Sequence, residues 1–209
     1  MKDRKKIILS TNNQDKLKEL EALVDRDHFD LKTKADFQLD DLDIEETGGS
    51  LEENALLKVM GLVSALEAKE EDVTEAYIIA DDTGLFVDAL DGRPGVYSSR
   101  YAGEKVSYED NVNKLLKELM AVPDEERGAY FATVLACYHR GETFCVEGRL
   151  EGRISRDRAG QDGFGYDPVF YIDDREKTLA QLTKEEKNAI SHRGRAYREL
   201  IRRLEDDDL

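Results

Sequence analysis

Two adjacent carboxylates, Asp81 and Asp82, follow an apolar run in the segment AYIIADDTGL. The apolar residues 77–79 predict a buried strand, where an uncompensated charge would be costly. Neighbouring strand side chains point to opposite faces, so we expect only one of the pair to face a given site. Ligands of open α/β sheets lie beyond the carboxyl ends of strands, where we place this pair, so one Asp is predicted to be a site residue. Position alone fits turn-forming aspartates before Gly84 equally well.

Other charged residues could complete a magnesium-assisted phosphate reaction around Asp82. Glu46 or Glu53 could supply the hard oxygen ligands that Mg²⁺ prefers, while Lys16 or Lys58 could neutralise a leaving group. A carboxylate could orient or deprotonate water. Taken singly, each residue also has an ordinary explanation: Glu46 as part of an acidic loop, Glu53 as the partner of Ser50 in a helix capping box, and Lys58 as a surface lysine.

The segment GFGYDPVF at 163–170 suggests a nucleobase-binding element. Its glycines permit close backbone approach, and Phe164 and Tyr166 offer flat faces for stacking. His192 and Arg193 could donate hydrogen bonds to a purine O6 or a phosphate. A hairpin turn with core aromatics is the alternative, and the segment by itself favours it.

These residues require an α/β framework. The predicted strands cover 5–11, 76–90 with a break near Gly84, 129–138, 142–154 and the aromatic residues after the GFGYDP loop. The predicted helices cover 12–24, 50–69, 107–120 and 191–204, and helical spacing puts Asn54 and Lys58 on one face. The first strand-to-helix junction carries Thr11, Asn13 and Lys16, and helix N-termini bind anions. The alternation predicts a three-layer α/β fold, and the hairpin makes its sheet mixed.

Composition limits the possible classes of function. The 209 residues predict one domain, 1–209, with a flexible acidic tail at 204–209. The net charge of −16 argues against nucleic-acid or anionic-membrane binding, and we expect a cytoplasmic protein without a membrane span. Cys137 and Cys145 flank the predicted hairpin turn and are expected to be buried, reduced thiols, with a cross-strand disulfide as the alternative. Walker-type, dinucleotide-binding, GxSxG and HExxH motifs are missing from the sequence.

Taken together, five blocks resemble the inosine triphosphate pyrophosphatase family, also called Ham1-like. They are STNNQDKLKEL at 10–20, EETGGSLEENALLK at 45–58, ADDTGLFVDALDGRPGVYSSRYAG at 80–103, GFGYDPVF at 163–170 and KNAISHRGRA at 187–196. The third block and GFGYDP are the most specific. Thr83 stands where the family most often has Ser, which keeps the hydroxyl.

The resemblance implies a homodimer with an elongated, two-lobed mixed α/β fold and a substrate cleft between the lobes. It implies Mg²⁺-dependent hydrolysis of noncanonical purine nucleoside triphosphates such as ITP, dITP and XTP to the monophosphate and pyrophosphate. Glu46 and Asp82 would hold the metal, and Asp82 would accept the proton of the attacking water. The substrate-binding residues would be Thr11, Asn13, Lys16, Lys58, Thr83, Phe164, Gly165, Tyr166, Asp167, Lys187, His192 and Arg193.

Two other functions remain open on sequence grounds. One is a non-catalytic nucleotide-binding protein with the same fold, which would bind ITP without releasing pyrophosphate. The other is a pyrophosphatase that prefers another base, such as a modified pyrimidine.

Overall fold

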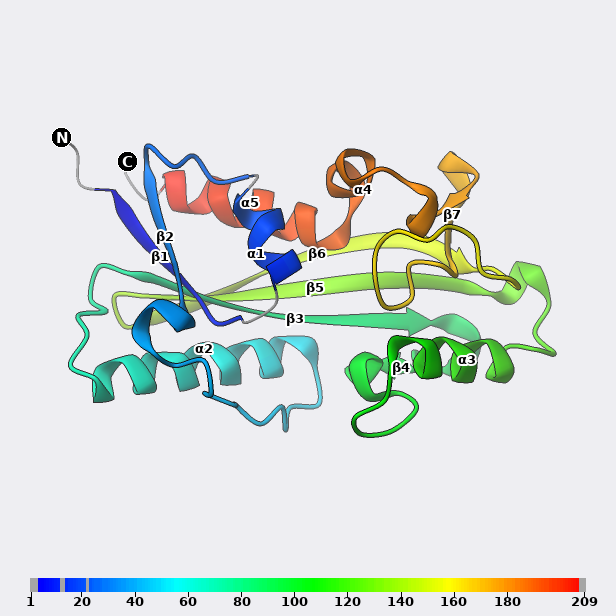
Figure 1. Ribbon diagram of the computed structural model, residues 1–209, viewed down its shortest axis with the longest axis horizontal. Helices are drawn as coiled ribbons and strands as arrows, with labels where there is room; N and C mark the ends of the chain where they lie inside the picture. Colours follow the sequence, from blue (N-terminus) through cyan, green and yellow to red (C-terminus); the bar gives the residue numbers. More distant parts are fainter. Residues whose placement is uncertain (1–3, 12–13, 22, 207–209) are drawn as a thin grey trace. The chain divides into compact units, whose positions relative to one another are not determined.

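The computed structural model describes residues 4–11, 14–21 and 23–206. Its strands are β1 (Lys5–Leu9), β2 (Phe29–Thr33), β3 (Tyr77–Val87), β4 (Pro94–Gly95), β5 (Gly128–His139), β6 (Glu142–Ile154), β7 (Phe170–Ile172) and β8 (Lys177–Thr178). Its helices are α1 (Gln14–Glu21), α2 (Leu51–Ala68), α3 (Tyr108–Glu118), α4 (Lys184–Ile190) and α5 (His192–Asp206), with short 3-10 turns between some of them (Figure 1).

One mixed sheet of eight strands runs through the chain in the order β2-β1-β3-β5-β6-β7-β8, with β4 paired to β3. Strand β1 is parallel to β2 and β3, whereas the pairs β3–β4, β6–β7 and β7–β8 are antiparallel. The predicted mixed α/β fold is therefore confirmed. The chain divides into two compact units, residues 1–82 with 133–148 and 194–209, and residues 83–132 with 149–193. The cleft expected between two lobes stays a prediction.

The first unit packs helices on both faces of its strands. Helices α1 and α5 lie on one face and α2 on the other (Figure 1). Side chains of β1, β3 and β5 form a core with α1 and α5, in which Leu20, Tyr197 and Leu200 are buried. On α2 the apolar stripe includes Ala55, Val59 and Leu62, all fully buried, as the helical periodicity predicted.

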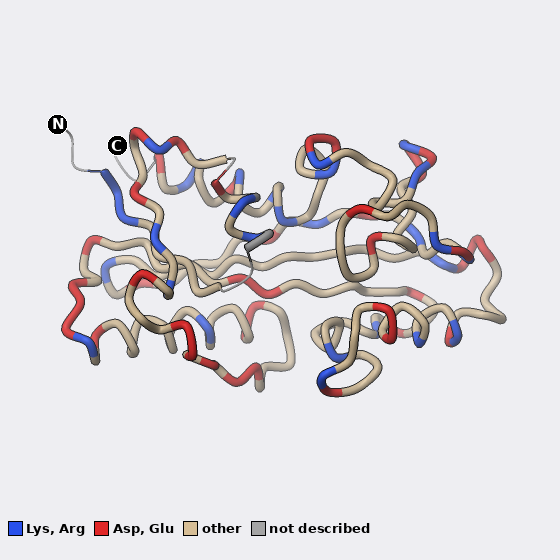
Figure 2. Tube along the Cα trace, in the orientation of Figure 1, with Lys and Arg blue, Asp and Glu red and all other residues tan. Residues whose placement is uncertain are grey.

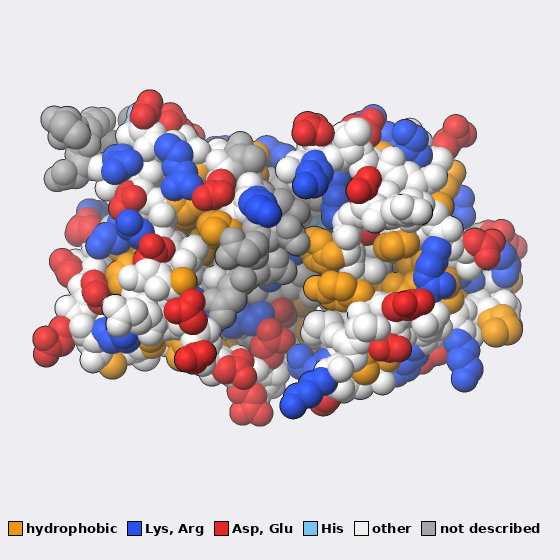
Figure 3. Space-filling model, viewed as in Figure 1, with side chains coloured by type: hydrophobic (Ala, Val, Ile, Leu, Met, Phe, Trp, Pro, Cys, Tyr) orange, Lys and Arg blue, Asp and Glu red, His pale blue; other side chains and the backbone are white. Residues whose placement is uncertain are grey.

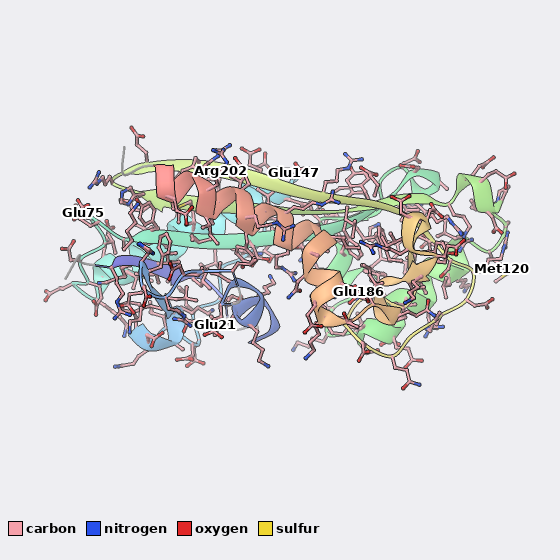
Figure 4. All side chains as sticks on the ribbon, turned by 90° about the horizontal axis from the view of Figure 1, so that it is seen from above. Glu21, Glu75, Met120, Glu147, Glu186 and Arg202 are labelled. Atoms are coloured by element: carbon pink, nitrogen blue, oxygen red, sulfur yellow. The ribbon has the colours of Figure 1, made fainter. Side chains whose placement is uncertain are left out.

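The second unit has its own core. Residues from the end of β3, from β5 to β7 and from α3 cluster there, including Leu85, Phe131 and Phe170. Helix α3 begins at a capping box between Ser107 and Asp110. Helix α4, which the sequence analysis did not predict, begins at another capping box, formed by Thr183 and Glu186. Glu186 is labelled on this helix in Figure 4.

The predicted break in the third strand is wrong, because β3 continues through Gly84 to Val87. A Cβ at Gly84 would meet the Gly95 carbonyl oxygen at 2.7 Å, so this glycine permits close approach of β4 rather than a break. The consequence concerns the carboxylate pair. Asp81 and Asp82 lie within a strand and not at its carboxyl end. Because there is no turn before Gly84, the alternative that they are turn-forming aspartates is excluded as well.

The β5–β6 hairpin forms as predicted. Strands β5 and β6 are joined at Arg140 and Gly141, both with positive φ, as tight hairpin turns require. Cys137 and Cys145 are not joined by a disulfide; Cys137 is buried as predicted, whereas Cys145 is half-buried. Cys137 packs in the core shared with α5, whereas Cys145 lies near enough to Glu52 of α2 to feel its charge, so the two thiols lie on opposite faces of the hairpin.

Charge is distributed unevenly along the chain. Asp and Glu concentrate along the segment leading into α2 (Figure 2), although both signs of charge occur across the visible face (Figure 3). Among the described residues, no helix is long and apolar enough to cross a membrane. The predicted flexible tail is only partly described: α5 extends through Asp206 with Leu204 fully buried, and 207–209 lie outside the described residues.

Candidate active site

The Lys58 ammonium joins two of the predicted metal-binding carboxylates. Its Nζ lies 2.9 Å from Asp82 Oδ1 and 2.6 Å from Glu46 Oε1. It also donates to the backbone carbonyl of Asp81 at 3.0 Å. Lys58 projects from α2, Asp82 from β3 and Glu46 from the segment before α2, so these three elements meet at one cation.

Burial and charge work against each other in this cluster. Burial acts to lower the pKa of Lys58, but the charges of Asp82 and Glu46 and their hydrogen bonds outweigh it, so the pKa is raised. Burial raises the pKa of the Asp82 carboxyl, and Glu46 adds to this while Lys58 opposes it. The ammonium is therefore held charged, and the carboxylate holds its proton more strongly than an exposed Asp.

Asp81 has a different cationic partner from Asp82. Lys16 of α1 lies 2.7 Å from Asp81 Oδ2 and 2.9 Å from Oδ1. Strand alternation sends Asp81 toward the face covered by α1 and Asp82 toward the face covered by α2. As alternation along the strand predicted, the two carboxylates face opposite sides of β3. The Asp81 carboxylate contacts Lys16, and the Asp82 carboxylate contacts Lys58.

Asn54 is a site residue whose role sequence reasoning missed. It is fully buried, its Nδ2 donates to Asp82 Oδ2 at 3.3 Å, and its Oδ1 accepts from the Gly48 backbone at 2.8 Å. The amide therefore ties the chain at Gly48, two residues after Glu46, to the strand carboxylate. Its spacing of four from Lys58 put it on the correct face of α2, but a neutral side chain carries no obvious chemical signal.

Glu53 has a structural position at the start of α2. Ser50 Oγ accepts from Glu53 N at 3.1 Å, as a helix cap should. The predicted capping box is incomplete, because the Glu53 carboxylate accepts from Gly49 N at 2.6 Å rather than from the N-cap residue. Of the two candidates for a ligand beside Asp82, Glu46 is therefore the one that shares the Lys58 ammonium.

In the second unit, the GFGYDP segment turns around Asp167. Asp167 Oδ2 accepts from Phe164 N at 2.8 Å and contacts Lys187 Nζ at 2.6 Å. A Cβ at Gly163, where φ is +83°, would meet the same carboxylate oxygen at 2.1 Å, so only glycine fits there. Gly165, also at positive φ, has open space where a Cβ would lie.

Two cations lie near the Phe164 ring. Lys187 Nζ lies 4.8 Å and Arg193 Cζ 5.8 Å from the centre of its half-buried ring. His192 is buried and stacks on Phe131 at a centroid distance of 4.7 Å. The predicted residues Phe164, Lys187 and Arg193 are thus neighbours.

Tyr166 is placed differently from Phe164. It is 4% exposed, belongs to the core of its unit and donates its hydroxyl to the Ser98 carbonyl at 2.8 Å. Of the two aromatics predicted to offer a stacking face, Phe164 alone keeps a partly exposed ring. Ser98 in turn accepts from Leu85 N and donates to the Gly95 carbonyl, so it links this loop to β3 and β4.

The remaining predicted residues lie near these groups in sequence or fall outside the structure. Thr11 follows β1 and is half-buried, and Thr83 follows Asp82 within β3 and is half-buried as well. Asn13 lies outside the described residues. The roles of all three stay predictions.

The donor set of the first unit fits a magnesium ion. Asp82 and Glu46 present hard carboxylate oxygens to a single cation, the kind of ligand that Mg²⁺ selects. Within the described part of the chain, no group of three or more His, Cys, Asp or Glu side chains forms a ready metal cage. Because Mg²⁺ commonly takes one or two protein carboxylates and completes its shell with water and substrate phosphates, two carboxylates are sufficient.

Fold and site together define an α/β protein with a mixed sheet and a carboxylate–lysine centre, a set of groups suited to phosphate chemistry. The chain belongs to the Ham1 family, whose model matches residues 7–203. The resemblance drawn from the five sequence blocks is thereby confirmed.

Curated relatives match along almost the whole chain. One from Thermoanaerobacter pseudethanolicus, named dITP/XTP pyrophosphatase, is 48% identical over 96% of this chain and 99% of its own length. A Bacillus subtilis relative of the same name is 43% identical over 96% of this chain and 98% of its own. The solved structure of the Staphylococcus aureus Ham1 protein superposes with a TM-score of 0.85, at 39% identity, covering 97% of this chain and all of that one (100%).

Proposed function

We propose that this protein hydrolyses deaminated purine nucleoside triphosphates, the dITP, XTP and ITP class, to the monophosphate and pyrophosphate. The observation that carries the proposal is the partly buried Asp82–Lys58–Glu46 cluster, which places carboxylate oxygens of the kind that Mg²⁺ selects beside an ammonium that would bind phosphate. The names of the relatives support the same substrate class.

Asp82 and Glu46 would hold Mg²⁺ in this enzyme. When bound, the ion would polarise the phosphate oxygens and offset charge on the departing pyrophosphate. Lys58 and Lys16, on opposite sides of β3, would bind phosphate oxygens and stabilise the same developing charge. Thr11 and Asn13 would add polar contacts at the start of α1.

Asp82 would accept the proton of the water that attacks the α phosphorus. A carboxylate works best as a base when its pKa approaches the working pH, and burial raises the pKa of Asp82 in that direction. Asn54 holds Oδ2 of the same carboxylate, which orients the group. The water would form the new P–O bond while the bond from the α phosphorus to the pyrophosphate oxygen breaks.

The second unit would bind the base and sugar. The Phe164 ring offers a stacking face, and Lys187, His192 and Arg193 supply donors, with Asp167, Gly165, Tyr166 and Thr83 shaping the surroundings. Oxygen at purine position 6 accepts hydrogen bonds, whereas the adenine amino group donates them. Donors left unpaired against ATP would disfavour it by as much as about 10⁴-fold.

We further propose that the protein acts as a homodimer on free nucleotide, as the resemblance implies. Light scattering after size exclusion, at protein concentrations spanning the working range, would measure the mass directly. A mass of one chain under all conditions would exclude the dimer.

The decisive experiment measures pyrophosphate release with Mg²⁺ from a panel of triphosphates that includes dITP, XTP, ITP, ATP, GTP and modified pyrimidines. We expect the first three to have the highest kcat/KM. Asp82→Asn should lower turnover by about 10²–10⁴-fold, while Asp43→Asn, at an exposed acidic position before α2, should not. Tight ITP binding without pyrophosphate release would instead indicate a nucleotide-binding protein.

A further inference from the structure

Residues 41–49, called here the Glu46 segment, alternate in exposure like a strand although they form no ladder. Leu42, Ile44, Glu46 and Gly48 are half-buried, and every residue between them is exposed, including Glu45. A period of two is the property of extended chain. A shift of one residue would turn Glu46 outward and Glu45 inward, so the register of this segment decides which glutamate meets Lys58.

Ile44 lies in a notch on α2 made by Gly61. A Cβ at Gly61 would come within 2.8 Å of Ile44 Cδ1 and 2.9 Å of Cγ1, which is closer than real atoms approach. Glycine inside a helix is less favourable than alanine. The helix therefore accepts a less stable residue at the point where the Ile44 side chain lies against it.

Polar contacts hold the segment on either side of Ile44. Lys34, itself buried, donates from Nζ to the Leu42 carbonyl at 2.7 Å. Gly48 N donates to Asn54 Oδ1 at 2.8 Å. The Lys34 bond to a backbone carbonyl does not depend on the side chain of the acceptor residue, so it attaches the segment without selecting its register. Ile44 in its notch selects one position, and Gly48, where a Cβ would meet Asn54 Oδ1 at 2.7 Å, fits the same register.

We propose that Ile44, seated against Gly61, sets the register of the Glu46 segment and thereby directs Glu46, rather than Glu45, to Lys58 and Asp82. Ile44 and Gly61 are positioning residues that act through Glu46. The consequence for catalysis rests on the function proposed above, whereas the register itself does not.

The register is tested without any activity measurement. Glu45→Cys and Glu46→Cys are each made in the otherwise unchanged chain and in Gly61→Ala, and the rate of alkylation at each cysteine is followed by peptide mass spectrometry. Cysteine at 45 should react severalfold faster than at 46 in the unchanged chain, and Gly61→Ala should narrow or reverse the difference. Equal rates at the two positions in the unchanged chain, or a difference that survives Gly61→Ala, would overturn the proposal.

Thermal stability supplies an independent test of the notch. Gly61→Ala alone should lower Tm, because the new methyl collides with Ile44. In an Ile44→Ala background the same substitution should raise Tm by roughly 2–4 °C, since only the gain in helix propensity remains. Ser64→Ala, at an exposed position of α2, is the matched control and should behave alike in both backgrounds. An increase in Tm from Gly61→Ala in the unchanged chain would exclude the notch.

Catalysis is then compared in the same variants. Gly61→Ala should raise the Mg²⁺ concentration for half-maximal pyrophosphate release, and Ile44→Ala should raise it as well, because it removes the side chain that occupies the notch. Normal Mg²⁺ dependence in a variant whose labelling pattern has changed would refute the positioning role. Failure of the unchanged protein to release pyrophosphate would instead contradict the proposed function and leave the labelling and Tm results to decide the register.

Discussion

Replacing Lys58 by Met tests the electrostatic account of the centre most directly. Methionine keeps the length of the unbranched stem but removes the ammonium that contacts Asp82 Oδ1 at 2.9 Å, Glu46 Oε1 at 2.6 Å and the Asp81 carbonyl at 3.0 Å. Removing one partner of a buried ion pair costs about 3–5 kcal/mol. The Lys58 and Glu46 side chains are 15% and 25% exposed, so solvent screening reduces the expected loss to about 2–4 kcal/mol near neutral pH.

The loss should depend on pH in a defined direction. Without Lys58, the pKa of Asp82 in the folded protein rises further above its ordinary value of 3.8. The folded state then binds its proton more tightly than the unfolded state, so stability decreases as pH rises from 3.8 through the folded pKa. Because the pKa of Lys58 is raised in the folded protein, the charged ammonium stabilises the unchanged protein at every pH below 10.5. This stabilisation is lost only as the pH rises above that value. The deficit of Lys58→Met should therefore be smaller near pH 4 than near neutral pH, where it is largest.

Urea unfolding at both pH values, in dilute buffer without divalent ions, measures this difference. Lys69→Met is the matched control, because Lys69 is an exposed residue that follows α2, and its effect should stay within about 0.5 kcal/mol. A Lys58→Met deficit as small as that of the control would refute the reasoning. So would a deficit of equal size at both pH values.

Three further predictions concern catalysis and reactivity. The acid limb of the pH profile of kcat/KM should lie above pH 3.8, because Asp82 accepts a proton only when ionised and burial raises its pKa. An acid limb at or below pH 3.8 would show that Asp82 is not the base. Tyr166→Phe loses the bond to the Ser98 carbonyl and should raise KM for dITP severalfold with little change in kcat, as steady-state kinetics would show. A fall in kcat with KM unchanged would argue against a positioning role. Cys145 should react slowly with thiol reagents at neutral pH, because burial raises its pKa to about 11, and stopped-flow labelling faster than for free cysteine would contradict this.

Periodicity predicted the elements that depend on local sequence. The apolar stripe of α2, the cap at Ser50, the β5–β6 hairpin and the start of α3 at Ser107 all follow from side chains close together in the chain. Helix α4 was missed because its seven residues bury no side chain and so carry no apolar pattern. Gly84 was misinterpreted, because the close approach of β4 that it permits is not visible in the sequence.

The chemistry of the centre was predictable as a set of residue types but not as an arrangement. The sequence by itself determined the family, the carboxylates and lysines available, and the opposite directions of Asp81 and Asp82, since alternation along a strand is local. Only the tertiary structure decided that Lys58 joins Asp82 to Glu46, that Lys16 meets Asp81, and that Asn54 rather than Glu53 supports the strand carboxylate. Such pairings bring together α1, α2, β3 and an irregular segment, and they depend on packing between residues far apart in the chain, which no local periodicity encodes.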